Sequence, residues 1–205
     1  MKKTIICNIP MKEQLDRIIY TSDDKSLPVA EREVIYPICA FLEKTMRADD
    51  ELKIILLVKK DDHAFSERNA ELFKHEFEAA NKNIGAAVTY TILDTEFEEE
   101  KSVHEKLMGR LVDELEIGSH ILADITYGPK DLPVVVFTAL SFAEKFLRCS
   151  VDNIVYGQAR FSNGHAVDAK ICDMVPLYCL SSVTSTIRSA EPEKARSMLK
   201  DLLSL

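Results

Sequence analysis

The stretch HILADITYGPKDLPVVVFTALSFAEKFL, residues 120–147, carries the pattern that decides the fold. Its first part, His120–Ile125, is an apolar run that predicts a buried strand, and Pro133–Leu147 predicts an apolar helix long enough to cover a sheet. A turn containing glycine, proline and lysine joins the two. A strand that turns directly into a covering helix is the repeating unit of a parallel α/β sheet.

The same alternation of strand and helix extends along the rest of the chain. The strand LKIILLVK, residues 52–59, is apolar on both faces, as expected of a parallel strand with helices on both sides. We therefore expect an α/β fold: a Rossmann-like, doubly wound and mostly parallel sheet with right-handed crossovers. The other predicted strands are Lys3–Ile9, Ala87–Leu93 and Asn153–Tyr156, and the other predicted helices are Pro28–Met46, Phe65–Asn81, Glu96–Leu115 and Pro176–Leu205.

Local signals refine these elements. The polar stretch Met11–Leu27 predicts an irregular loop. Pro37 lies inside the first predicted helix, so we expect a kink or a late helix start. Ser66 is a candidate N-cap of the helix Phe65–Asn81. Residues 158–171 predict a β-hairpin around Ser162–Gly164.

The C-terminal helical segment is expected in two pieces, with Pro192 at the first position of the second piece. The predicted domains are residues 1–175, the Rossmann-like domain, and residues 176–205, a helical extension for dimerisation or transmission.

Composition excludes several classes of protein. The chain has 205 residues and a net charge of −8, which argues against binding to duplex nucleic acid. No apolar run approaches the roughly 18 residues that span a bilayer, so we expect no membrane association. The five cysteines form no CxxC pair and predict buried thiols in a reducing compartment, with no metal site. These features predict a cytoplasmic protein without a cofactor.

The turn after the strand 120–125 combines groups that suit an anionic ligand. Asp124 ends an apolar strand, where a carboxylate must be hydrogen-bonded or functional. Thr126 supplies a hydroxyl, Gly128 permits a tight turn, and Lys130 adds a cation. Backbone N–H groups of a helix beginning near Leu132 would face the same space. The alternative is an ordinary strand–helix turn in which Asp124 is a structural hydrogen-bonding hub.

Common catalytic motifs are absent from the sequence. It contains no GxGxxG, no GxxxxGK[ST] and no GxSxG, which disfavours hydride transfer, P-loop and α/β-hydrolase chemistry. On residue types alone, a Rossmann-like domain that binds some nucleotide or phosphate ester explains the turn equally well.

The stretch DITYGPKDLPVVVFTALSFAEKF, followed by VDNIVYG, resembles the core of CRISPR-associated Rossmann-fold (CARF) proteins over Ile121–Gly157. In the most similar branch of that family, an Asp-(Ile/Val)-Thr-His-Gly-Phe-Arg turn precedes a helix that starts near Leu-Pro, and the next strand ends in Tyr-Tyr-Gly. This chain departs from that pattern at Tyr127, Pro129 and Lys130, which keeps the polarity of the turn but changes the ligand contacts.

The resemblance implies a homodimer that binds a cyclic oligoadenylate (cyclic tetra- or hexaadenylate), the second messenger of type III CRISPR antiviral defence. The ring would lie across the dimer axis on the strand-end loops of both subunits. The ligand-binding residues that the resemblance implies are Asn8, Ile9, Pro10 and Met11 in the first loop and Thr126, Tyr127, Gly128, Pro129 and Lys130 in the turn.

Two functions remain open under this resemblance. The first is a metal-independent ring nuclease, in which a ribose 2′-OH attacks the adjacent phosphate. Lys130 would then stabilise charge while Thr126 and Asn8 position the ribose-phosphate. The second is a non-catalytic sensor that regulates a partner or a further effector domain.

Several other polar residues have weaker assignments. His63 lies in a strand-end loop and could contact ligand or act in acid–base chemistry. Lys59 and Lys60 are expected to be a solvated pair, with a contribution to a positive rim as the alternative. The remaining histidines are expected to be surface or hydrogen-bonded structural residues: His75, His104, His120 and His165.

Overall fold

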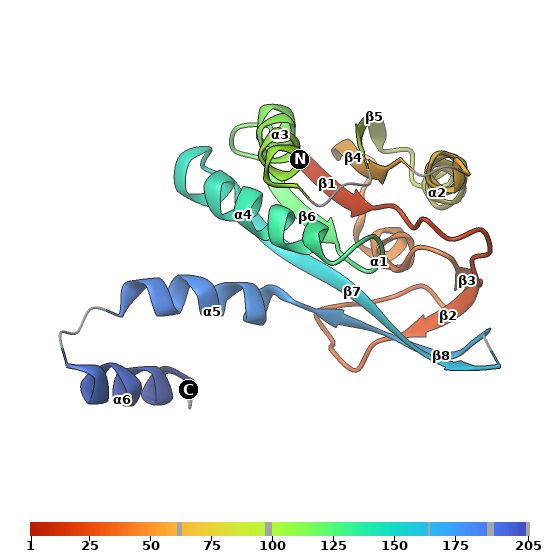
Figure 1. Ribbon diagram of the computed structural model, residues 1–205. Helices are drawn as coiled ribbons and strands as arrows, with labels where there is room; N and C mark the ends of the chain where they lie inside the picture. The colour runs from red at the N-terminus through yellow and green to blue at the C-terminus, as the bar shows by residue number, and fades with distance from the viewer. Residues whose placement is uncertain (61–62, 97–99, 164, 188–190, 204–205) are drawn as a thin grey trace. The chain divides into compact units, whose positions relative to one another are not determined.

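The computed structural model describes residues 1–60, 63–96, 100–163, 165–187 and 191–203. These residues form two compact units, Met1–Asp173 and Met174–Leu205. The first unit contains (Figure 1) β1 (Lys2–Asn8), β2 (Ile18–Thr21), β3 (Glu33–Val34), α1 (Pro37–Thr45), β4 (Glu51–Lys59), α2 (Phe65–Asn81), β5 (Ala87–Thr95), α3 (Lys101–Glu114), β6 (His120–Asp124), α4 (Asp131–Phe146), β7 (Ser150–Ser162) and β8 (His165–Asp173).

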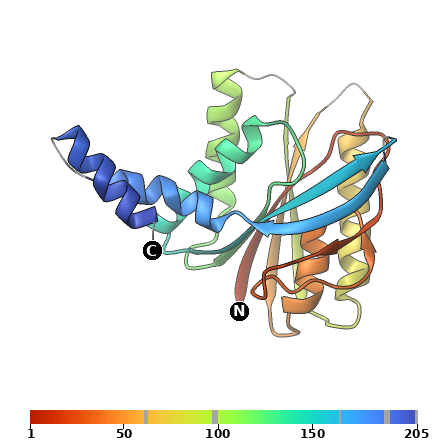
Figure 2. The ribbon, with the colours of Figure 1, turned by 90° about the horizontal axis from the view of Figure 1, so that it is seen from below.

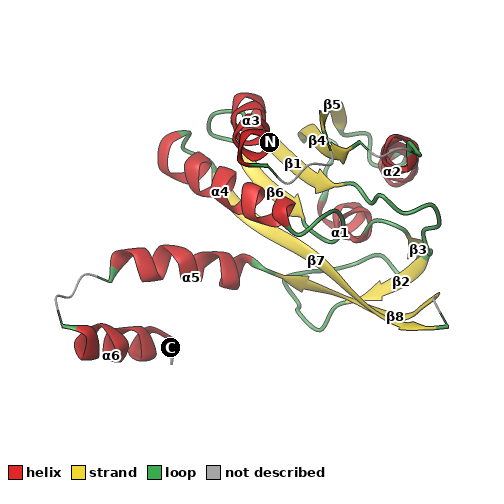
Figure 3. Cartoon of the chain, in the orientation of Figure 1, coloured by secondary structure: helices red, strands yellow, loops and turns green. Residues whose placement is uncertain are grey.

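The strands of the first unit form one eight-stranded sheet with the order β3-β2-β8-β7-β6-β1-β4-β5. The five neighbouring strands β7, β6, β1, β4 and β5 pair in parallel. Strand β8 returns antiparallel to β7 (Figure 3). The predicted class, a Rossmann-like and mostly parallel α/β sheet, is confirmed.

Helices cover both faces of this sheet. Figure 2 shows α3 and α4 on one side of the strands and α1 and α2 on the other. Alternate residues of β1, such as Ile5 and Cys7, are fully buried in the cluster that includes Phe73 and Phe77 of α2. Because side chains alternate across a strand, Ile6 and Asn8 face the α3 and α4 side.

Two short strands, β2 and β3, lie where the sequence predicted only a loop and the beginning of a helix. They are four and two residues long, too short to give a clear periodic pattern. They form because β2 pairs with β8, and this pairing joins Tyr20 to Ala169 across most of the chain. The helix in this region starts late, at Pro37, which is one of the two outcomes that the proline predicted.

The ends of two other helices differ from expectation. Ser66 is not the N-cap of α2, because Ala64 occupies that position and the Ser66 hydroxyl donates to the Lys59 carbonyl instead. The sequence predicted a helix from Glu96, but α3 begins at Lys101. Residues 97–99 of the predicted helix lie outside the described ranges.

The predicted hairpin and the division of the C-terminal helix are both confirmed. Strands β7 and β8 form the hairpin, with Ser162 paired to His165 next to its tip. The second unit contains α5 (Val175–Thr186) and α6 (Pro192–Leu203), and α6 begins at the predicted proline. All five cysteines, each within the described residues, carry free thiols. Cys7, Cys39 and Cys149 are buried as predicted, but Cys172 is partly exposed and Cys179 is exposed.

Candidate functional site

The carboxyl ends of β1 and β6 lie at the point where the sheet changes direction. Strands β4 and β5 lie on one side of β1, and the chain then crosses to β6 and β7 on the other side. In open α/β sheets, ligands bind in the crevice at such a switch point. Asp124 ends β6 and is the register partner of Cys7, so Asp124 and Asn8 lie at this edge.

Asp124 is a fully buried hydrogen-bonding hub. One carboxylate oxygen accepts from the Thr126 N–H at 2.9 Å and the other from the Ile38 N–H in the first turn of α1 at 3.3 Å. Burial raises the pKa of Asp124 to about 6, although these hydrogen bonds act in the opposite direction. The carboxylate therefore ties the turn to α1, and it does so beneath the surface on which a ligand would lie.

Thr126 and Tyr127 are also anchored within the protein. The Thr126 hydroxyl accepts from the Gly157 N–H at 2.8 Å, which joins the turn to β7. The Tyr127 hydroxyl donates to the Ile35 carbonyl at 2.8 Å, and its ring makes an edge contact with Tyr36. These bonds hold the turn rigidly and leave the outer parts of both side chains for a ligand.

Gly128 has a backbone conformation that favours glycine, with φ of +85°. A Cβ atom at this position would lie 2.8 Å from Leu132 Cδ1 and 3.5 Å from Asn8 Cβ. Asn8 therefore sits directly beside this glycine. Its carboxamide is fully buried, and neither Nδ2 nor Oδ1 makes a hydrogen bond to any residue that the structure describes. Buried amides are nearly always hydrogen-bonded, so Asn8 is exceptional.

The helix after the turn, α4, begins at Asp131, and Lys130 occupies its N-cap position. Lys130 is exposed, and its side chain has no ion pair or hydrogen bond with the described residues. The Asp131 carboxylate lies in the first helical turn, where it forms an ion pair with Lys59 at 3.1 Å. The expectation of a solvated lysine pair is therefore wrong for Lys59, which is 1% exposed.

A groove of about 490 Å³ opens at this edge of the sheet. One wall is the turn, and the others are the loop after β1 and the β7–β8 hairpin. Six of the predicted residues line it: Pro10, Met11, Thr126, Tyr127, Gly128 and Pro129. Residues of the groove that sequence reasoning missed include Lys12, Gln14, Tyr20, Tyr156, Gln158 and Phe161.

The remaining predicted residues lie outside the groove wall. Asn8 and Ile9 are fully buried, and Lys130 is exposed directly after Pro129 of the wall. His63 is exposed in the loop before α2, with its ring centroid 5.2 Å from that of Phe65. The structure thus brings together the turn and the loop after β1, but it does not bring His63 to the groove.

The loop after β1 is held at both ends. The Asn69 amide, fully buried in α2, donates to the Pro10 and Lys12 carbonyls, each at 2.9 Å. At the other end, Asp16 accepts from the Ala166 N–H at 3.0 Å and pairs with His165 at 3.2 Å. The hydrogen bond from Ala166 and then that from His165 hold the pKa of Asp16 below its ordinary value. The sequence signal for these contacts was Asn69, an asparagine on the buried face of a helix.

Within the described ranges, no cluster of histidine, cysteine and acidic side chains could hold a metal ion. None of the described helices is long and apolar enough to cross a membrane. No known family model matches this chain, and no curated protein matches it.

Proposed function

We propose that this protein binds a cyclic oligoadenylate (cyclic tetra- or hexaadenylate) as a homodimer, in the manner of the CARF proteins that its sequence resembles, and so acts in CRISPR antiviral defence. The observation that carries the proposal is the groove at the switch point of the sheet, one wall of which is the turn Thr126–Pro129. The residues that carry the resemblance thus coincide with the site that the fold favours.

The groove wall has the chemistry that recognises an unpaired adenine. Tyr127, Tyr156 and Phe161 offer aromatic surface for stacking, and the amides of Gln14 and Gln158 offer donors and acceptors for base edges. Tyr156 is 38% exposed and Phe161 is 60% exposed, so both rings are accessible to a ligand.

Two lysines at the groove support an anionic ligand. Lys12 lines the groove, with its ammonium 5.6 Å from the centre of the Phe161 ring. Lys130 directly follows Pro129 of the groove wall, and no carboxylate of the described residues neutralises it. Asp16 is the acidic residue of the wall, and its carboxylate is engaged by Ala166 and His165. Two lysines suit the phosphates of a small RNA despite the net charge of −8.

The size of the groove favours a dimeric site. A volume of about 490 Å³ takes one drug-sized group, which is far less than a ring of four or six nucleotides. Two grooves related by a two-fold axis would share one ring, and each would hold part of it. A single mononucleotide or phosphate ester in each groove is the competing candidate, because one groove suffices for it.

The proposal is tested by titrating the protein with cyclic tetraadenylate, cyclic hexaadenylate and AMP in EDTA, with calorimetric detection. We expect one ring to bind per two chains. Tyr156→Ala removes a stacking surface and should weaken ring binding roughly 10-fold or more. Phe146→Ala is the matched control, since Phe146 is 68% exposed on α4 and lies outside the groove wall.

Each contrary result has a distinct meaning. Binding of AMP at one molecule per chain, without binding of either ring, would replace the proposal by the mononucleotide candidate. Absence of binding by all three nucleotides would refute it. Equal losses in Tyr156→Ala and Phe146→Ala would place the ligand elsewhere.

A further inference from the structure

Three side chains of different chemistry meet where the loop after β1 approaches the β7–β8 hairpin. Lys12 and Asp16 belong to the loop and Phe161 belongs to β7, and all three line the groove. The Lys12 ammonium lies 5.6 Å from the centre of the Phe161 ring. Asp16 accepts a hydrogen bond from the N–H of Ala166, which is the register partner of Phe161. We call Lys12, Asp16 and Phe161 the hairpin subsite.

Phe161 gives the hairpin subsite a surface for a flat aromatic group. Its side chain is 60% exposed, although burying a phenylalanine ordinarily stabilises a protein by about 1.5–3 kcal/mol. An aromatic ring beside a cation in a groove suits a stacked nucleobase with a phosphate nearby. Stacking accepts every base, because each base has a flat face. A polar group at the edge of the stacked base must therefore decide which base is bound.

Asp16 is the carboxylate among the described residues of the groove wall. Hydrogen bonds from Ala166 and then from His165 lower its pKa, so the group is ionised and only accepts hydrogen bonds. His165 lies 3.2 Å from Oδ1, and the Ala166 N–H lies 3.0 Å from Oδ2. An ionised carboxylate has about four acceptor sites, so each oxygen can accept one more hydrogen bond. The Asp16 side chain is 34% exposed, which leaves it accessible to a ligand.

An acceptor at this place discriminates among purines by the group at carbon 6. Adenine carries an amine there, and its N–H donates to a carboxylate. Hypoxanthine and guanine carry a carbonyl oxygen there, which in the same orientation would face the carboxylate without a proton between them. Matched and mismatched base contacts of this kind differ by about 1–3 kcal/mol.

We infer that Asp16 is the specificity-determining residue of the groove: its carboxylate accepts the exocyclic amine of an adenine stacked on Phe161, while Lys12 binds a phosphate of the same ligand. The Ala166 N–H and His165 hold the carboxylate in position. This inference rests on the proposed binding of cyclic oligoadenylate, and it places base recognition on the hairpin side of the groove.

The test compares the binding of cyclic tetra- and hexaadenylate with that of cyclic tetra- and hexainosinate, in which hypoxanthine replaces every adenine. Each of the two grooves should favour adenine roughly 10-fold, so the wild type should bind the adenine ring roughly 100-fold more tightly. Asp16→Asn retains the shape of the side chain and gains N–H donors for a carbonyl oxygen. It should therefore bring the ratio of the two affinities to about one or below.

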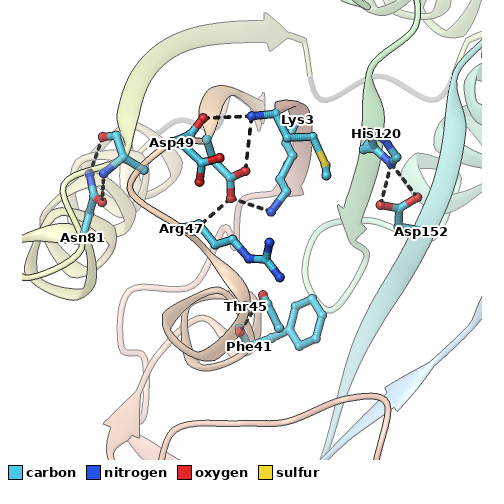
Figure 4. Close-up of polar contacts among 11 residues, drawn as sticks. Lys3, Phe41, Thr45, Arg47, Asp49, Asn81, His120 and Asp152 are labelled. Atoms are coloured by element: carbon cyan, nitrogen blue, oxygen red, sulfur yellow. Dashed lines mark hydrogen bonds and ion pairs between the residues drawn. The ribbon is translucent and has the colours of Figure 1, made fainter.

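The chain offers a matched control for this substitution. Asp152 pairs with His120 at 3.0 Å, as Asp16 pairs with His165, and its side chain is 37% exposed. This pair lies at the amino-terminal edge of β6, opposite the groove (Figure 4). Asp152→Asn should leave the ratio at its wild-type value. Phe161→Ala should weaken both kinds of ring equally, because stacking does not depend on the exocyclic group.

Failure of this inference is separable from failure of the proposed function. Equal binding of adenine and hypoxanthine rings by the wild type would overturn the role of Asp16 and leave ring binding in place, and this comparison needs no variant. A wild-type ratio in Asp16→Asn would have the same meaning. If no ring of either kind binds, both conclusions fall together.

Discussion

Single residues at the turn show how the fold constrains its own site. Asp124 is ionisable, yet it is completely buried, and its carboxylate accepts hydrogen bonds from the backbone N–H groups of Thr126 and Ile38. The pKa of about 6 lies above the ordinary value of 3.8, so the folded protein holds this proton more tightly than the unfolded chain does. The stabilising contribution is complete below the ordinary pKa and is lost as the pH rises through the folded-state pKa.

Asp124→Asn tests this linkage, because asparagine does not ionise. Between about pH 4 and pH 7, the free energy of unfolding of the wild type should fall by roughly 2 kcal/mol relative to that of the variant. Urea unfolding of both proteins across this range measures the difference. The other carboxylates contribute equally to the pH dependence of both proteins, so their contributions cancel. A difference that is independent of pH would show that Asp124 does not titrate in this window.

Gly128 offers a second test at the scale of one residue. Its φ of +85° and the proximity of Leu132 disfavour any side chain, so Gly128→Ala should lower the free energy of unfolding by about 2 kcal/mol. Gly109 provides the control: it lies inside α3, where an added Cβ atom would meet nothing within 4 Å, and Gly109→Ala should stabilise by about 0.5–1 kcal/mol. Denaturant unfolding that gave both variants the same sign would contradict the assignment of the turn.

At the scale of elements, the groove depends on a loop that has no regular structure of its own. The loop between β1 and β2 keeps its position because α2 holds one end and the β7–β8 hairpin holds the other. Arg68 adds a hydrogen bond to the Glu13 carbonyl from the same turn of α2. The position of this groove wall therefore depends on the packing of α2 and of the β7–β8 hairpin.

Asn69→Ala should loosen this loop. It removes two buried hydrogen bonds to the Pro10 and Lys12 carbonyls, at a cost of about 2 kcal/mol in the free energy of unfolding. Trypsin should also cleave faster after Lys12 under native conditions. Asn83→Ala, at an exposed position after α2, is the control and should change neither quantity. Unchanged stability and proteolysis in Asn69→Ala would show that the loop is held by other contacts.

At the scale of the whole molecule, the order of the strands brings the two halves of the candidate site together. Asn8 and Asp124 are far apart in the chain, but β1 and β6 are neighbours in the sheet. The hairpin then extends the sheet beyond β7 and completes the groove. The proposed two-fold site rests on the size of this groove, and the stoichiometry of ring binding tests it directly.

The sequence by itself determined the class of fold and the position of the turn. Local patterns suffice for these features: β4 is apolar on both faces, the bounds of α2 follow from its periodicity, and Gly128 and Pro129 interrupt the pattern between β6 and α4. These signals lie within short stretches of chain, so they do not depend on contacts with distant residues.

Only the tertiary structure decided which side chains meet. The short strand β2 exists because of β8, the loop after β1 is placed by Asn69, and Lys59 is buried because Asp131 lies opposite it. His104 was expected to be a surface or a hydrogen-bonded structural residue, and its contact with Asp131 exists because α3 packs against α4. Each of these outcomes depends on contacts between residues distant in sequence, and composition and periodicity carry no information about such contacts.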